Sequence, residues 1–146
     1  MNESPILAKE FLEKIKDNEK LIRAKQAERQ YWEELATSAT SNISGVRVKS
    51  STDGTIMQTQ ASEIVLIDEE IAWLKADISY RIGILKKLRP SEGLFLHQMY
   101  VLHTPLKALC VNERKSYSWG KHMHKVCLEH LQEILDKSFK KVHDCT

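Results

Sequence analysis

The spacing of apolar residues is most regular over residues 60–89. Apolar side chains recur there in alternating steps of three and four, with Arg81 as the one polar member, at Ile64, Ile67, Ile71, Leu74, Ile78, Leu85 and Leu88. A repeat sustained over this length predicts a coiled-coil-like helix. Such a helix pairs with another helix of the same chain or with a second copy, and the sequence leaves both arrangements open.

An earlier segment, residues 5–36, reads as one long helix that begins at a Ser4 N-cap followed by Pro5. Its expected apolar seam, interrupted by Glu28, runs through Leu21, Ala24, Tyr31 and Leu35. Pairing of this helix with the helix over residues 60–89 predicts an antiparallel hairpin. Residues 37–59 are rich in Ser, Thr and Gly, and we expect a linker or an ordered polar loop there.

The last third of the chain predicts three helices joined by short breaks. Pro90 ends the preceding helix, and Ser91 is expected to cap a short apolar helix. Thr104 and Pro105 predict the start of a second short helix. After a break at Arg114 and Lys115, Ser116 or Ser118 caps a final helix that runs to about residue 140. This layout is typical of a helix-turn-helix, whose last helix enters the major groove of DNA.

Together these elements predict an all-α protein in two parts. Residues 1–89 form a helical hairpin that includes the loop 37–59 and serves for dimerisation. Residues 90–146 form a helix-turn-helix domain. The composition agrees, because the chain of 146 residues has 42% hydrophobic and 29% charged residues with only five glycines.

Segments that would direct the chain out of the cytoplasm are not recognisable. No apolar run is long enough to cross a bilayer, and residues 1–14 lack a basic region followed by an apolar one. The three cysteines are widely spaced and odd in number, which favours free thiols in a reducing compartment. We therefore expect a cytoplasmic protein without a membrane partner.

Charge is unevenly distributed along the chain. Residues 1–100 hold 14 Lys or Arg and 15 Asp or Glu, whereas residues 101–146 hold 8 and 5. Residues 114–125 contain four basic residues, two histidines and no acid. This pattern suits contact with a polyanion, and it suits an ordinary solvated helix face as well.

The start of the final helix carries the residues expected to meet DNA. Lysines there supply phosphate contacts, hydroxyls and free backbone N–H groups hold a phosphate, and Lys121 or His122 reads a base edge. The predicted DNA-binding set is Arg114, Lys115, Tyr117, Ser118, Trp119, Lys121, His122 and Lys125.

This region resembles the ArpU/RinA-type phage late-gene transcription regulators, whose C-terminal part is similar to region 4 of sigma factors. The resemblance lies in the spacing of Tyr117, Ser118, Lys121, His124 and Leu128, in the run EHLQEIL, and in further short motifs over residues 20–137. It implies a phage-encoded activator of late genes that binds double-stranded DNA near RNA polymerase in the bacterial host cell. It also implies that the side chains of His124, Cys127 and Leu128 pack against other helices and do not contact DNA.

The chain departs from the family pattern around the turn. Arg114 or Lys115 stands where a small residue is usual, Glu113 where an aliphatic residue is usual, and Gly120 where a β-branched residue is usual. These departures motivate an alternative function: an adaptor or inhibitor that binds a host protein with the same scaffold.

Other chemistry is weakly indicated. His124, Cys127 and His130 follow one another at steps of three, but zinc sites usually combine ligands from more than one element. The adjacent carboxylates at residues 68–70 do not face one site on a helix, and no phosphate-binding glycine loop or hydrolase motif is present. We therefore expect that the protein is not an enzyme and that it binds neither a metal ion nor a cofactor.

Overall fold

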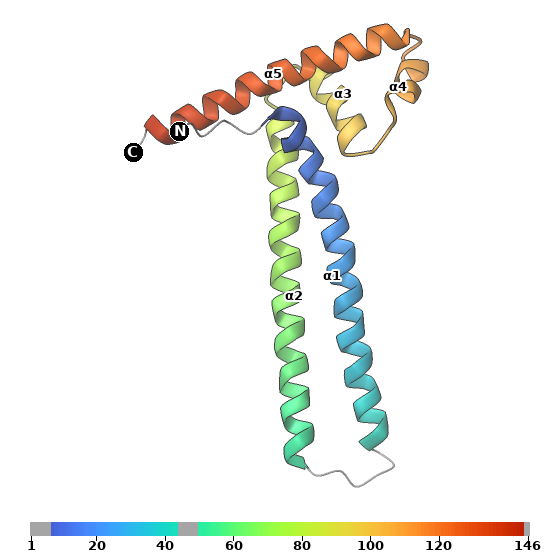
Figure 1. Ribbon diagram of the computed structural model, residues 1–146, viewed down its shortest axis with the longest axis vertical. Coiled ribbons are helices and arrows are strands. Elements are labelled where there is room, and N and C mark those ends of the chain that lie inside the picture. Colours follow the sequence, from blue (N-terminus) through green and yellow to red (C-terminus); the bar gives the residue numbers. More distant parts are fainter. Residues whose placement is uncertain (1–6, 44–49, 145–146) are drawn as a thin grey trace. The chain divides into compact units, whose positions relative to one another are not determined.

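The computed structural model describes the backbone of residues 7–43 and 50–144 and the side chains of residues 7–37 and 58–138. The described chain contains helices and turns and no strand, which confirms the all-α fold (Figure 1). The helices are α1 (Ala8–Ile43), α2 (Ser50–Leu85), α3 (Pro90–Tyr100), α4 (Leu106–Asn112) and α5 (Tyr117–Asp144). No helix within the described ranges is long and apolar enough to span a membrane.

Two compact units divide the chain. The head unit comprises residues 1–17 and 78–146, and the hairpin unit comprises residues 18–77. In the hairpin unit α1 and α2 run side by side in opposite directions, as expected for a helical hairpin (Figure 1). The division into domains 1–89 and 90–146 stays a prediction, as does the identity of α4 and α5 as a helix-turn-helix.

The predicted seam of α2 is confirmed by burial. Ile67, Ile71, Leu74 and Leu85 are buried, and Ile64 and Ile78 are half-buried. The helix ends at Leu85 and not near residue 89, so that Leu88, also buried, lies in the turn that follows it. The polar member of the seam, Arg81, is accommodated within the head unit. Its guanidinium donates a hydrogen bond of 3.1 Å to the backbone oxygen of Phe11 and lies 4.7 Å from the centroid of that ring.

The predicted seam of α1 is wrong by one residue. Leu21, Tyr31 and Leu35 are exposed. The side chains that are instead buried or half-buried step by three and four through Ala8, Phe11, Ile15, Asn18, Ile22, Lys25, Arg29, Trp32 and Ala36. The true seam contains an asparagine, a lysine and an arginine, and the apolar pattern of the sequence therefore favoured the neighbouring stripe.

The predicted loop 37–59 is largely helical. α1 continues to Ile43 and α2 already begins at Ser50, while residues 44–49 lie outside the described part of the chain. Serine and threonine are less favourable than alanine in a helix by only fractions of a kcal/mol, about 0.5 per residue. A helix that is already nucleated adds one hydrogen bond for each residue it fixes, and this gain outweighs so small a preference.

The predicted helix starts need correction. Ser4 and Pro5 lie outside the described residues, and α1 begins at Ala8. Arg89, not Ser91, is the N-cap of α3, because a residue before proline adopts an extended conformation and Pro90 fits the first helical position. Pro105, not Thr104, precedes α4.

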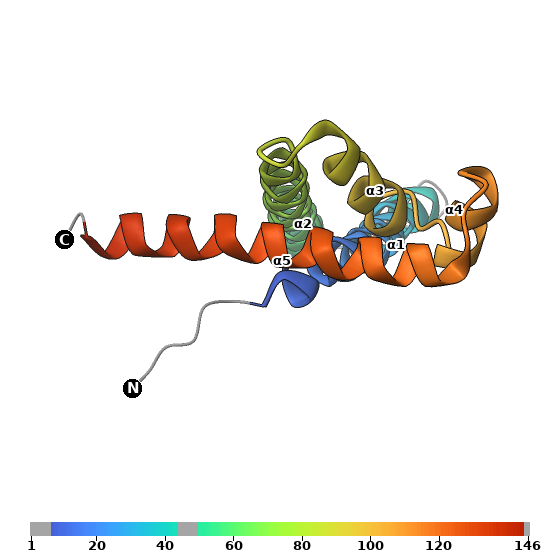
Figure 2. The ribbon, with the colours of Figure 1, turned by 90° about the horizontal axis from the view of Figure 1, so that it is seen from above.

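The head unit buries its core where α3 and α4 pack against α5. Figure 2 shows α4 beside the first turns of α5 and α3 farther along the same helix. Leu96 of α3, Leu109 of α4, and Cys127 and Leu131 of α5 are at most 1% exposed. This packing fixes α4, the connection after it and the first half of α5 as one rigid element.

Candidate nucleic-acid interface

The connection from α4 to α5 is a tight, fully hydrogen-bonded turn. The backbone N–H of Arg114 donates to Val111 O at 3.1 Å and that of Lys115 to Cys110 O at 2.8 Å. Arg114 adopts a positive φ of 57°. These features define a Schellman motif, in which the residue after the helix cap is left-handed. Glycine is the residue most favoured there, and arginine occupies the position in this chain.

A serine caps the following helix. The Oγ of Ser116 accepts a hydrogen bond of 3.1 Å from the backbone N–H of Trp119. This contact satisfies one of the unpaired donors at the start of α5. Of the two expected caps, the structure therefore confirms Ser116, and Ser118 lies in the first turn of α5 with its side chain exposed.

Gly120 sets the distance between α4 and α5. A Cβ atom at this position would overlap the Sγ of Cys110 and lie 3.1 Å from Cδ1 of Leu106, and both of these residues belong to α4. Gly120 is buried within α5. Glycine therefore stands here because the two helices approach more closely than any side chain allows.

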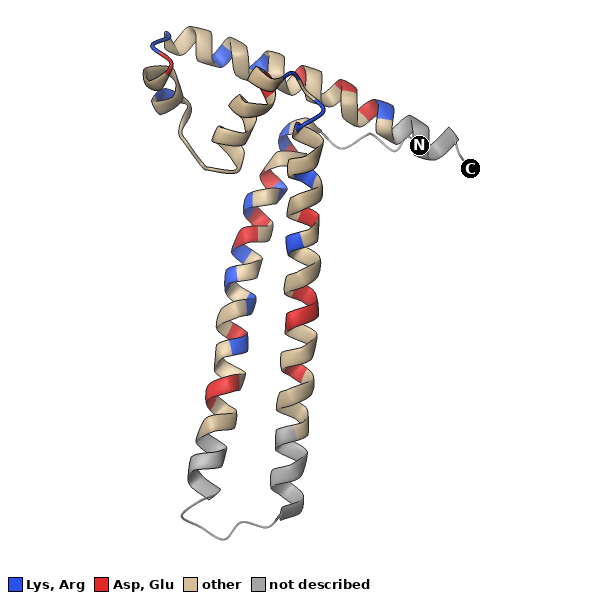
Figure 3. Cartoon of the chain, turned by 180° about the vertical axis from the view of Figure 1, so that it is seen from behind, with Lys and Arg blue, Asp and Glu red and all other residues tan. Residues whose placement is uncertain are grey.

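The basic surface consists of cations around the α4–α5 connection. All of its members are exposed: Lys107, Arg114, Lys115, Lys121 and Lys125. Among the described residues, the ion pairs do not involve these five side chains. Figure 3 shows basic positions at this connection, next to the acidic Glu113, and in the first half of α5, with acidic positions following in the second half.

Tyr117 lies at the centre of the basic surface. The ammonium of Lys107 is 5.8 Å from the centroid of its ring and that of Lys121 is 5.1 Å away. Because Tyr117, Lys121 and Lys125 are four residues apart on α5, they share one side of the helix. The sequence did not single out Lys107. Its place in the first turn of α4 becomes informative only once α4 is known to lie beside Tyr117.

The remaining predicted site residues divide into two groups. His122 is exposed in the first half of α5. Trp119 is half-buried, its ring meets Phe95 edge-on at 6.0 Å, and Lys115 lies 5.8 Å from its centroid. Trp119 therefore packs on α3 with one side and supports the basic surface with the other.

Farther along α5 lie residues that pack against the rest of the head unit, at the positions that the resemblance implies. Cys127 is fully buried, and burial followed by the charge of Glu92 raises its pKa to about 12. Leu128 packs against the core. The ring of His124 stacks on Tyr100 at 5.8 Å, and its Nε2 lies 2.8 Å from the tyrosine hydroxyl. Burial lowers the pKa of His124 and raises that of Tyr100 to about 12, so this hydroxyl donates to a neutral ring.

A second polar contact joins α3 to α5. The Nδ1 of His130 lies 2.6 Å from the Oε2 of Glu92, whose side chain is only 8% exposed. His124, Cys127 and His130 do not converge on one point. In the part of the chain that is described, no group of three His, Cys, Asp or Glu side chains could hold a metal ion.

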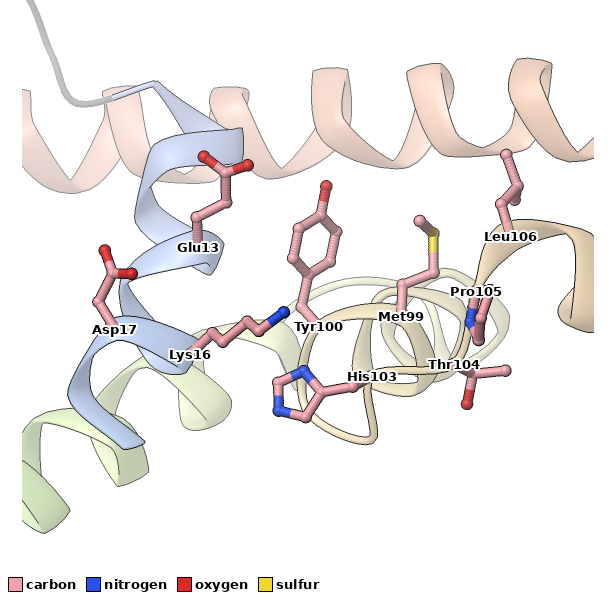
Figure 4. Close-up of a pocket in the computed structure, with 9 residues that line it drawn as sticks. All are labelled: Glu13, Lys16, Asp17, Met99, Tyr100, His103, Thr104, Pro105 and Leu106. Carbon is pink, nitrogen blue, oxygen red and sulfur yellow. The ribbon is translucent and has the colours of Figure 1, made fainter. Parts of the chain in front are cut away.

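A pocket of about 440 Å³ opens beside Tyr100 in the head unit. Glu13, Lys16 and Asp17 of α1 line one side of it, and His103 and Thr104 line the other (Figure 4). The carboxylates and the lysine carry opposite charges, and the pocket therefore offers mixed polar contacts.

Comparison of the chain with protein-family models, curated proteins and solved structures gives no match.

Proposed function

We propose that this protein binds double-stranded DNA through the basic surface. The observation that carries the proposal is the gathering of five exposed cations around the α4–α5 connection, none of them paired with a carboxylate among the described residues, with two of them over the ring of Tyr117. In a near-neutral chain of net charge +2, such a local excess is what a polyanion requires. The rigid packing of α4 on α5 holds these cations in a fixed arrangement, which favours a regular partner such as a duplex.

Each part of the surface has a distinct task in this proposal. Arg114, Lys115 and Lys107 contact phosphates beside the groove, and the hydroxyl of Ser118 adds a neutral phosphate contact. Lys121 and Lys125 lie along α5, which enters the major groove, and they contact the phosphates at the edges of that groove. His122 reads a base edge there. Trp119 acts mainly by holding the start of α5 against α3.

The wider role follows from the resemblance to ArpU/RinA-type regulators. We propose a phage- or prophage-encoded transcription regulator that acts in the cytoplasm of a bacterial host and activates late genes. In this role the protein works near RNA polymerase and binds DNA as a homodimer.

Fluorescence anisotropy with a labelled duplex from upstream of the neighbouring genes tests DNA binding. The double variant Lys121→Glu, Lys125→Glu should weaken binding at least about tenfold, because two attractive phosphate contacts become repulsive. The matched control, Lys14→Glu with Lys87→Glu, makes the same charge change on two exposed residues of the head unit that lie outside the basic surface and outside the hairpin unit. We expect the control to bind as the wild type does.

Salt dependence tests the phosphate mechanism separately. The slope of log affinity against log salt should become shallower by about 0.9 for each phosphate that a variant no longer neutralises. No binding by the wild type at about 50 mM salt would end the DNA proposal. Binding without salt dependence would show that phosphates are not the main contact.

An apolar groove favours the second candidate, a protein-binding adaptor. Between the end of α2 and α3, a groove of about 610 Å³ is lined by apolar side chains, among them Ile82, Leu85, Leu88 and Leu94. Leu94 is 56% exposed. A Leu94→Glu variant should abolish capture of a host protein in this alternative, whereas it should leave DNA binding unchanged.

A further inference from the structure

The hairpin unit exposes more large apolar side chains than it buries. Among its described residues the buried hydrophobic side chains are Ile22, Ile67, Ile71 and Leu74. The exposed large ones are Leu21, Tyr31, Leu35, Val65, Leu66 and Trp73. Burial of apolar surface is the main term that offsets the entropy lost when a chain orders. The packing of these two helices on each other therefore provides only a small part of the stabilisation that the hairpin needs.

The seam between the two helices has no room for a partner. Asn18 donates a hydrogen bond of 2.6 Å to Asp77 across it. The Lys25 ammonium pairs with Glu70 at 3.0 Å, and the Arg29 guanidinium with Asp68 at 2.6 Å. The sequence of α2 allowed its apolar repeat to pair with a second copy, but this face of α2 is occupied by α1 of the same chain. Any partner of the hairpin must bind to another face.

One face of the hairpin unit is suited to a partner. Leu21 and Trp73 line the same groove, which has a volume of about 310 Å³. Trp73 is 68% exposed and Leu66 is 52% exposed. Positions seven residues apart lie on nearly the same side of a helix, so Leu66 follows Trp73 along α2. Leu35 lies two such steps beyond Leu21 along α1, with the exposed Glu28 between them. We call the four apolar residues the hairpin face.

The charges beside this face are complementary to those of a second copy. Residues 20–29 of α1 hold four Lys or Arg and one Glu, whereas residues 63–70 of α2 hold four Asp or Glu and no Lys or Arg. The pairs Lys25–Glu70 and Arg29–Asp68 show that these segments lie at the same level (Figure 3). A two-fold axis along the hairpin places each α1 over the partner's α2 at that level. Basic residues then meet acidic ones, and Leu21 meets the partner's Trp73.

The available area is sufficient for a stable dimer. The α1 part of the hairpin unit, residues 18–43, is about 39 Å long at 1.5 Å per residue. Two helices side by side, each about 10 Å wide, offer a face of about 800 Å². Specific interfaces bury about 800 Å² on each partner.

We infer that a second copy of this chain packs on the hairpin face and completes a four-helix bundle with a two-fold axis along the hairpin. The inference rests on the homodimer proposed above and adds the surface that makes it. It does not depend on the contact with DNA, because the basic surface belongs to the head unit.

Sedimentation of the full-length protein without DNA tests this inference. The wild type should be dimeric over a range of about 5 to 200 µM. Trp73→Glu and Leu21→Lys should each raise the dimer dissociation constant more than about tenfold, because each places a charge in an apolar contact. The matched control is Val111→Glu, at a residue that is 74% exposed in the head unit. It should leave the dimer intact.

Mixing the two disruptive variants tests the symmetry. In the mixture, Lys at position 21 of one copy meets Glu at position 73 of the other, and the second contact of the pair is wild type. A heterodimer should therefore form from two variants that are monomeric alone. Failure to form it would overturn the two-fold arrangement.

The inference as a whole is overturned if the wild type is monomeric at about 200 µM. It is also overturned if Trp73→Glu dimerises as tightly as the wild type. Trp73→Ala, a milder change, should weaken the dimer in the same direction, and circular dichroism checks that each variant keeps its helices. A dimeric protein that does not bind DNA would refute the proposed DNA binding and leave the dimer standing, whereas a monomer that binds DNA would refute the dimer and leave DNA binding standing.

Discussion

Gly120 of α5 lies directly against the Sγ of Cys110 in α4, with no space for a Cβ atom between them. We expect Gly120→Ala to lower the free energy of unfolding by about 1–3 kcal/mol, because overpacking a rigid contact forces the helices apart. The better helix propensity of alanine offsets at most about 1 kcal/mol of this decrease. Urea unfolding followed by circular dichroism measures the change.

The control for this variant removes the opposing atom. In Cys110→Ala, Gly120→Ala the new methyl group occupies space that the sulfur has left. The double variant should therefore be more stable than Gly120→Ala alone, and the two changes should be strongly non-additive. Additive effects would show that the contact between Gly120 and Cys110 does not limit the approach of the helices.

Gly120 also shows why the sequence alone misjudged part of this site. In the sequence it is a departure from the family pattern and a weak point in a helix. Glycine is needed at position 120 because Cys110, ten residues earlier in the chain, lies against it. This contact becomes apparent only once α4 is known to pack on α5. The exposed cations of α5 were predictable because their spacing within one helix is local information. Lys107 was not, because its neighbour Tyr117 belongs to a different helix.

Arg114 occupies a left-handed position with φ of 57°. Glycine relieves the clash that any Cβ suffers in this region, and the gain, reduced by the greater freedom of glycine in the unfolded chain, should reach up to about 1 kcal/mol. Arg114→Gly should therefore stabilise the protein. If Arg114 contacts a phosphate, the same variant should bind DNA more weakly, with the salt slope reduced by about 0.9.

Lys115→Gly is the matched control for Arg114→Gly. It removes a neighbouring cation from a residue without a positive φ. This variant should weaken DNA binding without any gain in stability. Destabilisation by Arg114→Gly would show that the arginine side chain makes contacts that outweigh its backbone strain.

The seam of the hairpin illustrates a second limit of sequence reasoning. Along α2 the seam is apolar almost throughout, and the heptad predicted the buried side chains correctly. Along α1 the seam includes Lys25 and Arg29, which are half-buried and whose charges are satisfied by acids of α2. Their long apolar stems cover the seam while the charged ends reach its edge. A search for apolar residues therefore selects the exposed stripe through Leu21 and Leu35.

The head unit should lose stability on acidification through His124. Burial lowers the pKa of this ring below its ordinary value of 6.5. The unfolded chain therefore takes up a proton at about pH 6.5, whereas the folded chain does so only at lower pH. The contribution of the neutral ring is fully present above pH 6.5 and is lost as the pH falls toward the lowered pKa. Protonation also removes the acceptor that Tyr100 uses.

A His124→Gln variant isolates this effect, because glutamine accepts the same hydrogen bond and does not titrate. Between about pH 7.5 and pH 5, the wild type should lose more of its free energy of unfolding than this variant. His122→Gln, at an exposed position of the same helix, should follow the wild type. Equal pH dependence in wild type and His124→Gln would remove His124 as the cause.

Gln60 should be a weak point of the hairpin unit. Its side chain is 2% exposed, and among the described residues neither its amide nitrogen nor its amide oxygen has a hydrogen-bond partner. A buried polar group without a partner lowers stability by about 1–3 kcal/mol, because it gives up water and receives nothing in return. Gln60 continues the apolar repeat of α2 at four and seven residues before Ile64 and Ile67, so leucine fits the position. We therefore expect Gln60→Leu to raise the free energy of unfolding by about this amount.

Gln58→Leu, at an exposed position of the same helix, is the matched control and should change stability little. A lower stability of Gln60→Leu alone, measured by urea unfolding, would mean that the buried amide is held by a partner such as a bound water.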